Sequence, residues 1–585
     1  MLSFPYNDKV GKNKFYLGDI IISYNYMNQP KNISNLNFKN KVVKIFIHGF
    51  LHLLGFDHKK NSDFNKMQRE ENKLFNNKKI IYFIVFILGG LTSFSHPPYN
   101  WFLINFFTLS FFFILLVQNK NLDKKNYFFY GWLFGFGYFL FSLYWIAISL
   151  TFDTSLKILI PVSIIIIPSF LSLFFAIPAY LLSFFFKFKN LALILIFSLI
   201  LGLFEFVRGH IFTGFPWNLF LYSLSNKISY IQMTSFIGTY GLNLVTTTFF
   251  FIPAILFLKK TKFELILSFV FFSILLSFFL IGELRINDHN RILKTQKHIQ
   301  IKIISSNIEI KRFYDSSKEV EIIDEMIKIS NPEKEIPTLF IWPEGTLTST
   351  YLNDIDKYKT FFKKFSEKHL ILLGINDLNE DDNLKIYNSL AIVDNELNIK
   401  ALYRKNDLVP FVEFLPFENA LNKIGLRSIT NNYQSFSKGD RRDIININND
   451  DFNLNILPLI CYEVIYSGKL SEINNYDLII NISEDGWFGK SIGPHQHFAH
   501  SVFRAIEEGK SIIRSSNNGI SAIIDPKGKI IKINKSTSSG ALSEYGFEKL
   551  SEMTVFSTYG RNNIFFYLVL IYITLIFFLK RQLGR

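Results

Sequence analysis

The chain has 585 residues, with 63 Lys and Arg against 48 Asp and Glu, a net charge of +15 and one cysteine, Cys461. This length allows about two to four domains, and a composition of 49% hydrophobic and 19% charged residues excludes disorder for most of the chain. A single thiol excludes an intramolecular disulfide and a cysteine-rich zinc module. Cys461 is therefore either a small buried apolar residue, the usual state of a free cysteine, or a nucleophile.

The first segment, residues 1–77, is polar and contains histidines at metal-ligand spacing. His48 and His52 are four residues apart, so they share one face of a helix, and His58 follows as a third ligand. Three neutral imidazoles leave a fourth position open for water, the pattern of a catalytic zinc site. Gly49 stands where zinc proteases with this spacing have their catalytic Glu. We therefore predict that these three histidines bind a metal ion.

Together with Leu2-Ser3-Phe4-Pro5 and Leu17-Gly18-Asp19-Ile20, this segment resembles the bacterial rRNA maturation factor family of single-strand-specific zinc endoribonucleases. The resemblance implies a partial α+β metal-binding domain that corresponds to the C-terminal half of the family's fold. A gene fusion that has lost half of the domain and a start codon inside a run-on reading frame would both explain it. Because half of the fold is missing in either case, nucleic acid is only a weak candidate partner, through this segment alone.

Seven apolar runs between residues 80 and 281, and an eighth near the C-terminus, predict membrane-spanning helices. A bilayer core of about 30 Å needs about 20 apolar residues per helix. The predicted domain limits are 78–285 for the first seven spans and 561–585 for the eighth span with its tail. The spans are expected at about 80–95, 99–117, 127–150, 158–186, 190–207, 230–258, 263–281 and 564–579.

The distribution of Lys and Arg predicts the side of the membrane on which each loop lies, because cytoplasmic loops are enriched in both. The N-terminal segment, every second gap between spans and the C-terminal tail carry the excess, which includes Lys124, Lys187, Lys259 and Lys580. We therefore expect both termini in the cytoplasm and the long segment before the eighth span on the opposite side. The net positive charge is then a topology signal and not a nucleic-acid footprint.

Residues 286–560 alternate short apolar, often β-branched runs with polar, helix-compatible stretches. This rhythm predicts a soluble α/β domain. Helices are expected at 315–330 and 355–368. Strands are expected at 299–305, 338–342, 370–374, 454–460, 477–482 and 519–524.

Three stretches of this domain bring reactive side chains to the ends of apolar runs. Phe340-Ile341-Trp342-Pro343-Glu344 ends in a carboxylate, Tyr403-Arg404-Lys405 ends in an ammonium group, and Leu459-Ile460-Cys461-Tyr462-Glu463 contains the thiol. Strand ends in α/β folds are common places for reacting groups. A carboxylate can take the thiol proton, and an ammonium group can stabilise a thiolate and a tetrahedral oxyanion. Each residue alone has a common structural reading, as a cap, a solvated ion or a buried thiol, so the argument depends on the set.

Together these motifs resemble the nitrilase (carbon–nitrogen hydrolase) superfamily and, more closely, its membrane branch, the apolipoprotein N-acyltransferases. The resemblance covers about residues 80–580. Further motifs that support it are Leu408-Val409-Pro410-Phe411, Gly214-Phe215-Pro216-Trp217-Asn218, Asp485-Gly486-Trp487-Phe488-Gly489, Gly493-Pro494-His495-Gln496-His497 and Arg514-Ser515-Ser516-Asn517-Asn518-Gly519. The resemblance implies a multi-pass α-helical membrane protein of about eight spans with an extracytoplasmic αββα sandwich. It also implies the bacterial inner membrane, with the sandwich on the periplasmic side.

The same resemblance implies a reaction, the N-acylation of the α-amino group of the diacylglyceryl-cysteine of apolipoproteins. A membrane phospholipid would be the acyl donor, the apolipoprotein the acceptor, and no cofactor is implied. Glu344 would be the general base, Lys405 would support the oxyanion, and Cys461 would carry the acyl chain as a thioester.

Four further residues match positions that the family needs around this centre. Glu413 and Glu463 match two acidic positions near the nucleophile, and Tyr462 and Trp487 match aromatic positions around the acyl site. The chain departs from the usual pattern at Val412, where Gly is common, and at Glu484, where Asn is common.

Two local interpretations remain open at this stage. The apolar stretch from Phe411 to Phe417, which includes Phe414 and Leu415, is either an arm that dips into the membrane interface or a core segment. Glu205 and Arg208 are three apart near the end of a span, where charges need partners or water. Their spacing would allow them to pair with each other, and a structural role is expected rather than a catalytic one.

Three alternative functions compete with acyl transfer. A membrane-tethered nitrilase-type amidase would not need eight spans or the Gly-Phe-Pro-Trp motif. A transporter with an outer binding domain usually has ionisable or broken midspan positions, which are scarce in these runs. A zinc endoribonuclease with a membrane anchor would need the missing half of its domain.

Overall fold

The computed structural model describes residues 78–583 except for 119–122, 155, 314, 380–384, 415, 417–434, 472–473 and 536–537. Before residue 78 it describes 2–5, 18–21 and the single residues His48, Leu51, Asp63 and Met67. In that segment β1 (Leu2–Pro5) pairs antiparallel with β2 (Gly18–Ile21). His52 and His58 lie outside the described residues, and so do Leu415 and Phe417 of the apolar stretch.

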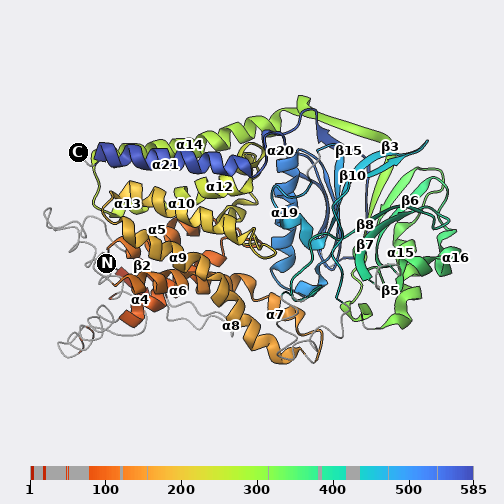
Figure 1. The fold of residues 1–585 in the computed structure, drawn as a ribbon, viewed down its shortest axis with the longest axis horizontal. Helices are drawn as coiled ribbons and strands as arrows, with labels where there is room; N and C mark the ends of the chain where they lie inside the picture. The colour runs from red at the N-terminus through yellow and green to blue at the C-terminus, as the bar shows by residue number, and fades with distance from the viewer. Residues whose placement is uncertain are drawn as a thin grey trace.

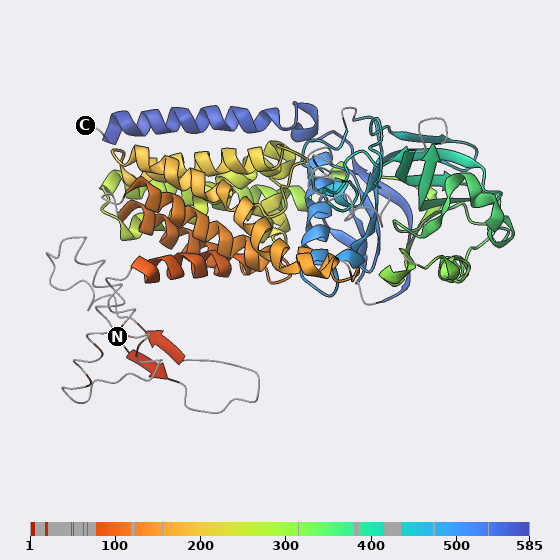
Figure 2. The same ribbon diagram turned by 60° about the horizontal axis from the view of Figure 1, so that its bottom comes forward.

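Each predicted span contains a helix, and the helices form a bundle at one end of the molecule (Figure 1). The start of α4 and the end of α21 both lie at the end of the bundle that faces away from the sheets (Figures 1 and 2). The principal helices are α4 (Lys78–Ser93), α5 (Leu103–Gln118), α6 (Lys124–Leu143), α8 (Ile160–Leu171), α9 (Leu173–Leu182), α10 (Asn190–Arg208), α12 (Thr234–Phe251), α14 (Lys262–Asn287) and α21 (Asn563–Leu583).

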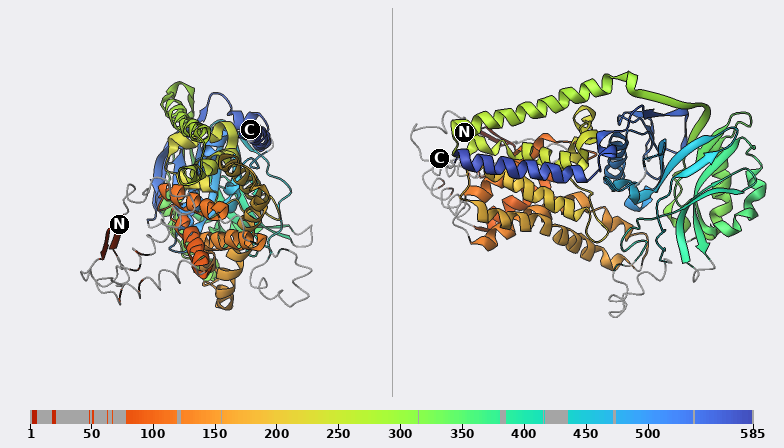
Figure 3. Two further views of the ribbon diagram at one scale, coloured as in Figure 1. Left: turned by 90° about the vertical axis from the view of Figure 1, so that its left-hand side faces the viewer. Right: turned by 45° about the horizontal axis from the view of Figure 1, so that its top comes forward.

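Length and apolar composition make five helices of the described chain able to cross a membrane. They span 157–185, 190–208, 234–257, 262–287 and 563–582. Shorter apolar helices occupy residues 80–93 and 103–118. α14 and α21 lie on the outside of the bundle (Figure 3). Many of their large apolar side chains are exposed, as expected for helices that face lipid.

Small residues allow α4 and α6 to pack closely. A Cβ atom added at Gly89 would lie 2.0 Å from the Phe134 carbonyl oxygen, and one added at Gly137 would lie 2.1 Å from the Phe86 carbonyl oxygen. Any side chain at either glycine would therefore separate the two backbones, which is the usual reason for small residues at membrane helix contacts.

The remaining part of the chain folds into two stacked sheets with helices on both outer faces, the predicted αββα sandwich (Figure 1). The seven-stranded sheet has the order β15-β3-β4-β6-β7-β8, with β5 paired to β6, and its strands β3, β4 and β6 are parallel. The six-stranded sheet has the order β14-β13-β12-β11-β10-β9, with β10, β11 and β12 parallel.

The strand bounds confirm all six predicted strands and add further ones. The seven-stranded sheet contains β3 (Ile292–Ser305), β4 (Thr338–Ile341), β5 (Leu347–Tyr351), β6 (His369–Asn379), β7 (Lys385–Val393), β8 (Ile399–Arg404) and β15 (Gly540–Leu550). The six-stranded sheet contains β9 (Ile445–Asn448), β10 (Asn453–Ile460), β11 (Leu478–Glu484), β12 (Ile512–Asn517), β13 (Ser521–Ile524) and β14 (Ile530–Asn534).

Helices cover the two sheets differently. The outer face of the seven-stranded sheet packs on α15 (Glu319–Ser330) and the short α16 (Lys359–Phe362). The helix predicted at 355–368 is therefore shorter than expected, because α16 is a single turn of α-helix after a 3₁₀ segment. The outer face of the six-stranded sheet packs on α19 (Gly493–Glu508), which lies between the sheet and the bundle (Figure 1). Side chains of this sheet, α19 and the bundle share one continuous apolar core.

Glu205 and Arg208, which their spacing would allow to pair, form no direct ion pair with each other in the described part of the chain. Among the described residues, Glu205 accepts a hydrogen bond from Asn243 Nδ2 at 2.6 Å, whereas Arg208 donates to the carbonyl oxygens of Phe215 and Asn218 at 2.6 and 3.4 Å. The loop after α10 folds back over the Arg208 side chain, so backbone carbonyls solvate the guanidinium group instead of the carboxylate. The structural role expected for both residues is consistent with these contacts.

Candidate active site

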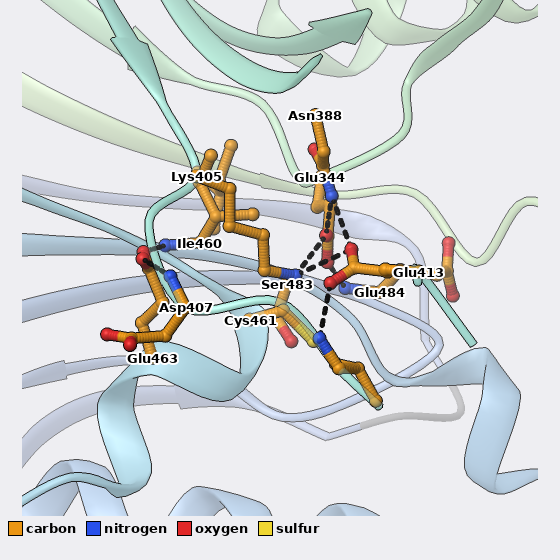
Figure 4. Close-up of polar contacts among 12 residues, drawn as sticks. Glu344, Asn388, Lys405, Asp407, Glu413, Ile460, Cys461, Glu463, Ser483 and Glu484 are labelled. Carbon is orange, nitrogen blue, oxygen red and sulfur yellow. Dashed lines mark hydrogen bonds and ion pairs between the residues drawn. The ribbon is translucent and has the colours of Figure 1, made fainter. Parts of the chain in front are cut away.

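Three strands that end at one edge of the sandwich carry the three predicted reactive groups. Glu344 follows β4 by three residues, Lys405 follows β8 directly, and Cys461 follows β10 directly. The approach of the Glu344 loop to β6 requires a glycine, because a Cβ atom at Gly374 would lie 2.7 Å from Glu344 Cα. The fold therefore brings side chains from three separate stretches of the sequence into one cluster (Figure 4).

A buried ion cluster forms the centre of the site. Lys405 Nζ lies 2.9 Å from Glu413 Oε1 and 3.3 Å from Glu344 Oε1, and Lys405 is only 1% exposed. Asn388 Nδ2 donates to both carboxylates, at 2.8 Å to Glu344 and 2.9 Å to Glu413. The Glu484 backbone N–H donates to Glu344 Oε2 at 2.9 Å. Burial alone would lower the pKa of Lys405, but the two carboxylates hold that pKa well above its usual value, so the ammonium stays charged.

The Cys461 side chain lies beside this cluster (Figure 4) and is partly exposed. Its backbone has φ +50°, a left-handed conformation that costs a non-glycine residue about 1–2 kcal/mol. Burial and the negative charge of Glu344 raise the pKa of the Cys461 thiol well above its usual value, against the opposing effect of the Lys405 ammonium. The side chain therefore rests as a thiol and needs a base before it can attack.

Glu463 holds the turn after the nucleophile. Its carboxylate accepts a hydrogen bond from the Ile460 N–H at 2.8 Å and from the N–H groups of Asn406 and Asp407 at 2.9 and 3.0 Å. Arg442 and the Tyr403 hydroxyl donate to the same carboxylate. These donors outweigh the effect of burial and lower the pKa of Glu463. Glu463 therefore ties the Cys461 turn to the loop that follows Lys405, and it acts as a scaffold.

The two predicted aromatic residues lie toward the helix bundle. The Tyr462 hydroxyl donates to the Gly214 carbonyl oxygen at 3.0 Å, in the loop that follows α10. Trp487 packs edge-on against Phe152 of the bundle, with ring centroids 5.9 Å apart, and against Phe313 at 5.2 Å. Both side chains therefore join the site to the membrane-embedded part of the chain.

The predicted metal ligands are separate from this cluster in the sequence. Of the three histidines, the structure describes only His48, in a helical position, and it gives no geometry for His52 or His58. The chemistry of the donor set fits zinc, because three imidazoles with an open fourth position are a known zinc ligand set.

Sequence reasoning missed several residues that complete the site. Asn388 donates hydrogen bonds to both Glu344 and Glu413. The sequence feature that could have pointed to it is its position as a polar residue inside the largely apolar strand β7. Arg442 forms an ion pair with Glu463, with Nη2 and Oε1 2.8 Å apart, but it lies in none of the motifs found in the sequence. Arg312 forms a buried ion pair with Glu484, which explains how this chain accommodates Glu where Asn is common.

Comparisons with known proteins agree with this geometry. A family model described as Apolipoprotein N-acyltransferase N-terminal domain matches residues 88–252, and one described as Carbon-nitrogen hydrolase matches residues 312–543. The Apolipoprotein N-acyltransferase of Rickettsia prowazekii (strain Madrid E) is 32% identical over 509 residues, which cover 86% of this chain and 98% of that relative. The chain belongs to the apolipoprotein N-acyltransferase family.

The chain is also similar to other known proteins. The acyltransferase of Rhodopseudomonas palustris is 30% identical over 470 residues, which cover 77% of this chain and 86% of that protein. A solved structure of a variant of the amidase from Nesterenkonia sp. AN1 matches 44% of this chain and 92% of its own, with 12% identity and a TM-score of 0.29. A third family model, described as Endoribonuclease YbeY, matches residues 1–79, so the N-terminal resemblance is confirmed as a separate segment ahead of the acyltransferase.

Proposed function

We propose that this acyltransferase moves an acyl chain from a membrane phospholipid to the α-amino group of the diacylglyceryl-cysteine of apolipoproteins, through a thioester on Cys461. The observation that carries the proposal is the Lys405 ammonium, buried between Glu344 and Glu413 beside the thiol. A cysteine with a carboxylate base and a fixed cation has the groups that acyl transfer requires.

In the first half-reaction Glu344 takes the thiol proton as Cys461 Sγ attacks the ester carbonyl carbon of the phospholipid. The S–C bond forms, and the carbonyl oxygen becomes an oxyanion that Lys405 stabilises. The oxyanion then collapses, the ester C–O bond breaks, and the departing lysophospholipid alcohol takes the proton from Glu344. The acyl chain remains on the sulfur as a thioester.

In the second half-reaction the neutral α-amino group of the acceptor attacks the thioester carbon. Glu344 takes a proton from the attacking nitrogen, and a second oxyanion forms against Lys405. The C–S bond then breaks, an amide remains on the acceptor, and Cys461 recovers its proton from Glu344. Glu413 carries no proton in either step and holds Lys405 at 2.9 Å.

Contacts with the helix bundle favour transfer over hydrolysis. Tyr462 and Trp487 link the nucleophile turn to the loop after α10 and to Phe152. A thioester at the membrane surface is shielded from water, whereas an acceptor that is itself a lipid reaches it from the bilayer. The exposed Phe411 side chain, 66% accessible, supports the arm interpretation of its stretch.

We also propose the topology that the sequence predicts, with eight spans in the bacterial inner membrane and the sandwich in the periplasm. The start of α4 and the end of α21 lie together at the far end of the bundle, which supports cytoplasmic termini (Figures 1 and 2). The proposed domains are 1–77, 78–285, 286–560 and 561–585. A Cys-accessibility experiment that labels a cysteine introduced at Lys259 only after permeabilisation would agree with this orientation.

The proposed reaction is tested in cells depleted of their own apolipoprotein N-acyltransferase. Wild-type chain is expected to add one acyl chain to the N-terminus of a reporter lipoprotein, measured by mass spectrometry. Cys461→Ser is expected to leave the reporter diacylated. An unmodified reporter with expressed wild-type chain would reject the function, and full acylation by Cys461→Ser would reject the nucleophile.

A second function concerns residues 1–77 only, because the endoribonuclease family model matches them. We propose that His48, His52 and His58 bind one zinc ion, which would supply a Lewis acid for RNA cleavage. The purified full chain is expected to contain zinc, and His52→Ala together with His58→Ala is expected to remove it. Equal zinc content in both proteins would contradict the site, whatever the acyltransferase activity.

A further inference from the structure

The carbonyl oxygen of Cys461 receives hydrogen bonds from two side chains on different elements. His497 Nε2 of α19 lies 3.2 Å from this oxygen, and Asn481 Nδ2 of β11 lies 3.4 Å from it. A carbonyl oxygen only accepts hydrogen bonds, so Nε2 of His497 carries a proton and donates it. Both donors hold the peptide group between Cys461 and Tyr462, which orients the left-handed nucleophile.

One buried guanidinium group fixes both donors. Arg514 NH2 lies 2.9 Å from Asp485 Oδ2, and Arg514 NH1 donates to Asn481 Oδ1. His497 Nδ1 lies 2.8 Å from Asp485 Oδ1. Arg514, Asp485 and His497 are all fully buried. The planar guanidinium fork leaves little freedom to any side chain it holds, so the imidazole ring has one orientation.

One face of the His497 ring packs against the Trp217 side chain, which follows α10 of the bundle. The Trp217 ring stacks on it with centroids 5.4 Å apart and an interplanar angle of 27°. Trp217 Nε1 donates to the side-chain oxygen of Gln496, the neighbour of His497, at 2.8 Å, and Trp145 Nε1 donates to the same oxygen at 3.2 Å. Two tryptophans of the bundle therefore hold the start of α19 in place.

The loop that carries Trp217 is itself held by contacts with the helix bundle and with the sandwich. Arg208 and the Tyr138 hydroxyl, both in the bundle, donate to the Asn218 carbonyl oxygen. From the sandwich, Tyr462 donates to the Gly214 carbonyl oxygen. A continuous series of contacts thus runs from the bundle through Trp217 and His497 to Cys461.

We propose that His497 is a positioning residue for acyl transfer, held between Asp485 and the membrane-borne Trp217 so that its Nε2–H fixes the backbone of Cys461. The inference rests on the proposed function, because it assumes that Cys461 is the nucleophile. It gives a role to the Gly493–His497, Asp485 and Arg514 motifs, which contain none of the three proposed catalytic groups. One ligand-type atom each of Cys461, Asp485 and His497 lies within 4.8 Å of the other two, so the ring is held close to the nucleophile it positions.

Three variants of the full chain in lipid nanodiscs test this role. His497→Leu removes the donor, and His497→Gln keeps an amide N–H donor. His500→Leu is the matched control, because His500 lies one turn further along α19, is buried, and packs on the same Trp217 at 5.1 Å. The readout is the rate of acyl-enzyme formation with phospholipid alone, at several lipid concentrations, followed by the mass of the intact protein.

His497→Leu is expected to lower the maximal rate by about 100-fold with little change in the lipid concentration at half-maximal rate, because a misplaced nucleophile reduces kcat. His497→Gln is expected to recover at least a tenth of the wild-type rate, and His500→Leu to stay within threefold. A wild-type rate in His497→Leu, or an equal loss in His500→Leu, would overturn the inference. Equal inactivity of His497→Gln and His497→Leu would also overturn it and indicate proton transfer by His497. Absence of any acyl-enzyme in the wild type would instead reject the proposed function.

Discussion

The two sheets of the sandwich contribute different halves of the candidate site. The seven-stranded sheet supplies Glu344, Lys405 and Asn388, and its outer face packs, among the described residues, on α15 and α16. The six-stranded sheet supplies Cys461, and its outer face shares one apolar core with the membrane bundle. The groups proposed to move protons and stabilise charge therefore belong mainly to one layer, whereas the proposed nucleophile is mounted on the layer that contacts the membrane helices.

This difference has a physical basis. The charged half of the site, which contains Glu344, Lys405 and Glu413, is stabilised by short-range contacts among these residues. One ammonium group offsets two buried carboxylates. The nucleophile half depends on backbone geometry, because Cys461 occupies a strained left-handed conformation that side chains from several elements hold. Changes to the first half are expected to act on the chemistry, and changes to the second half on the orientation of the sulfur.

The largest effect is expected from Lys405→Met. Without the ammonium group, Glu344 and Glu413 lose their common cation, so two like charges remain in one buried cluster. Acyl-enzyme formation is expected to fall by about 100- to 1,000-fold, and stability by about 3 kcal/mol, measured as the rate with phospholipid and as thermal unfolding in detergent. Lys302→Met is the control, because this largely buried lysine of β3 donates to the Asn331 carbonyl oxygen instead. A loss of less than tenfold in the rate of acyl-enzyme formation by Lys405→Met would contradict the role proposed for the ammonium group.

Glu344→Gln is expected to move two rates in opposite directions. The carboxylate raises the pKa of the Cys461 thiol, so its removal lowers that pKa and increases the thiolate fraction at a fixed pH. Alkylation of Cys461 by iodoacetamide at pH 8 is therefore expected to become faster. Acyl-enzyme formation is expected to fall by about 100-fold because the general base is lost.

The control for that experiment is Glu319→Gln, a buried carboxylate that accepts hydrogen bonds from Thr350 and Tyr358 on the far side of the same sheet. It is expected to leave both rates near those of the wild type. An unchanged or slower alkylation rate in Glu344→Gln would contradict the predicted effect of this carboxylate on the thiol pKa.

A smaller effect is expected from Glu463→Gln, in the nucleophile half. Gln keeps one acceptor oxygen but loses the charge that Arg442 neutralises, so the turn loosens and activity falls by about tenfold. The folded-state pKa of Glu463 is lowered, so its stabilisation is present above about pH 4.3, the pKa of an unfolded Glu, and is lost as pH falls through the folded pKa. The melting temperatures of wild type and Glu463→Gln are expected to differ most above about pH 5 and to converge in acid. A difference that grows as pH falls would contradict this assignment.

The smallest effect on activity is expected at the Arg312–Glu484 pair, which borders both halves. Arg312→Met leaves a buried carboxylate without its cation and is expected to cost about 3 kcal/mol of stability. The double variant Arg312→Met with Glu484→Gln is expected to be more stable than Arg312→Met alone. Thermal unfolding of the two single variants and the double variant measures this coupling, and strict additivity would mean that the pair does not interact. Acyl transfer should change by less than tenfold in each.

The sequence was most informative where function restricts the residue type. Glu344, Lys405 and Cys461 at the ends of apolar runs predicted that the three side chains meet, because strand ends converge at one edge of a sheet. The αββα sandwich followed from the family resemblance of the motifs around them. Asn388 and Arg442 were missed since neither lies in a motif, and their roles depend on side-chain contacts between distant strands. Among the described residues, Glu205 and Arg208 do not pair with each other, because backbone carbonyls, which no sequence pattern displays, solvate Arg208.

The most direct test of the account is the covalent state of Cys461. Purified wild-type chain is incubated with phospholipid and no acceptor, digested, and the peptide that contains Cys461 is analysed by mass spectrometry. The account predicts an added mass of one acyl chain on Cys461, removed by neutral hydroxylamine and absent in Glu344→Gln at short reaction times. An acyl chain on another residue, or acceptor acylation without any adduct on Cys461, would contradict it.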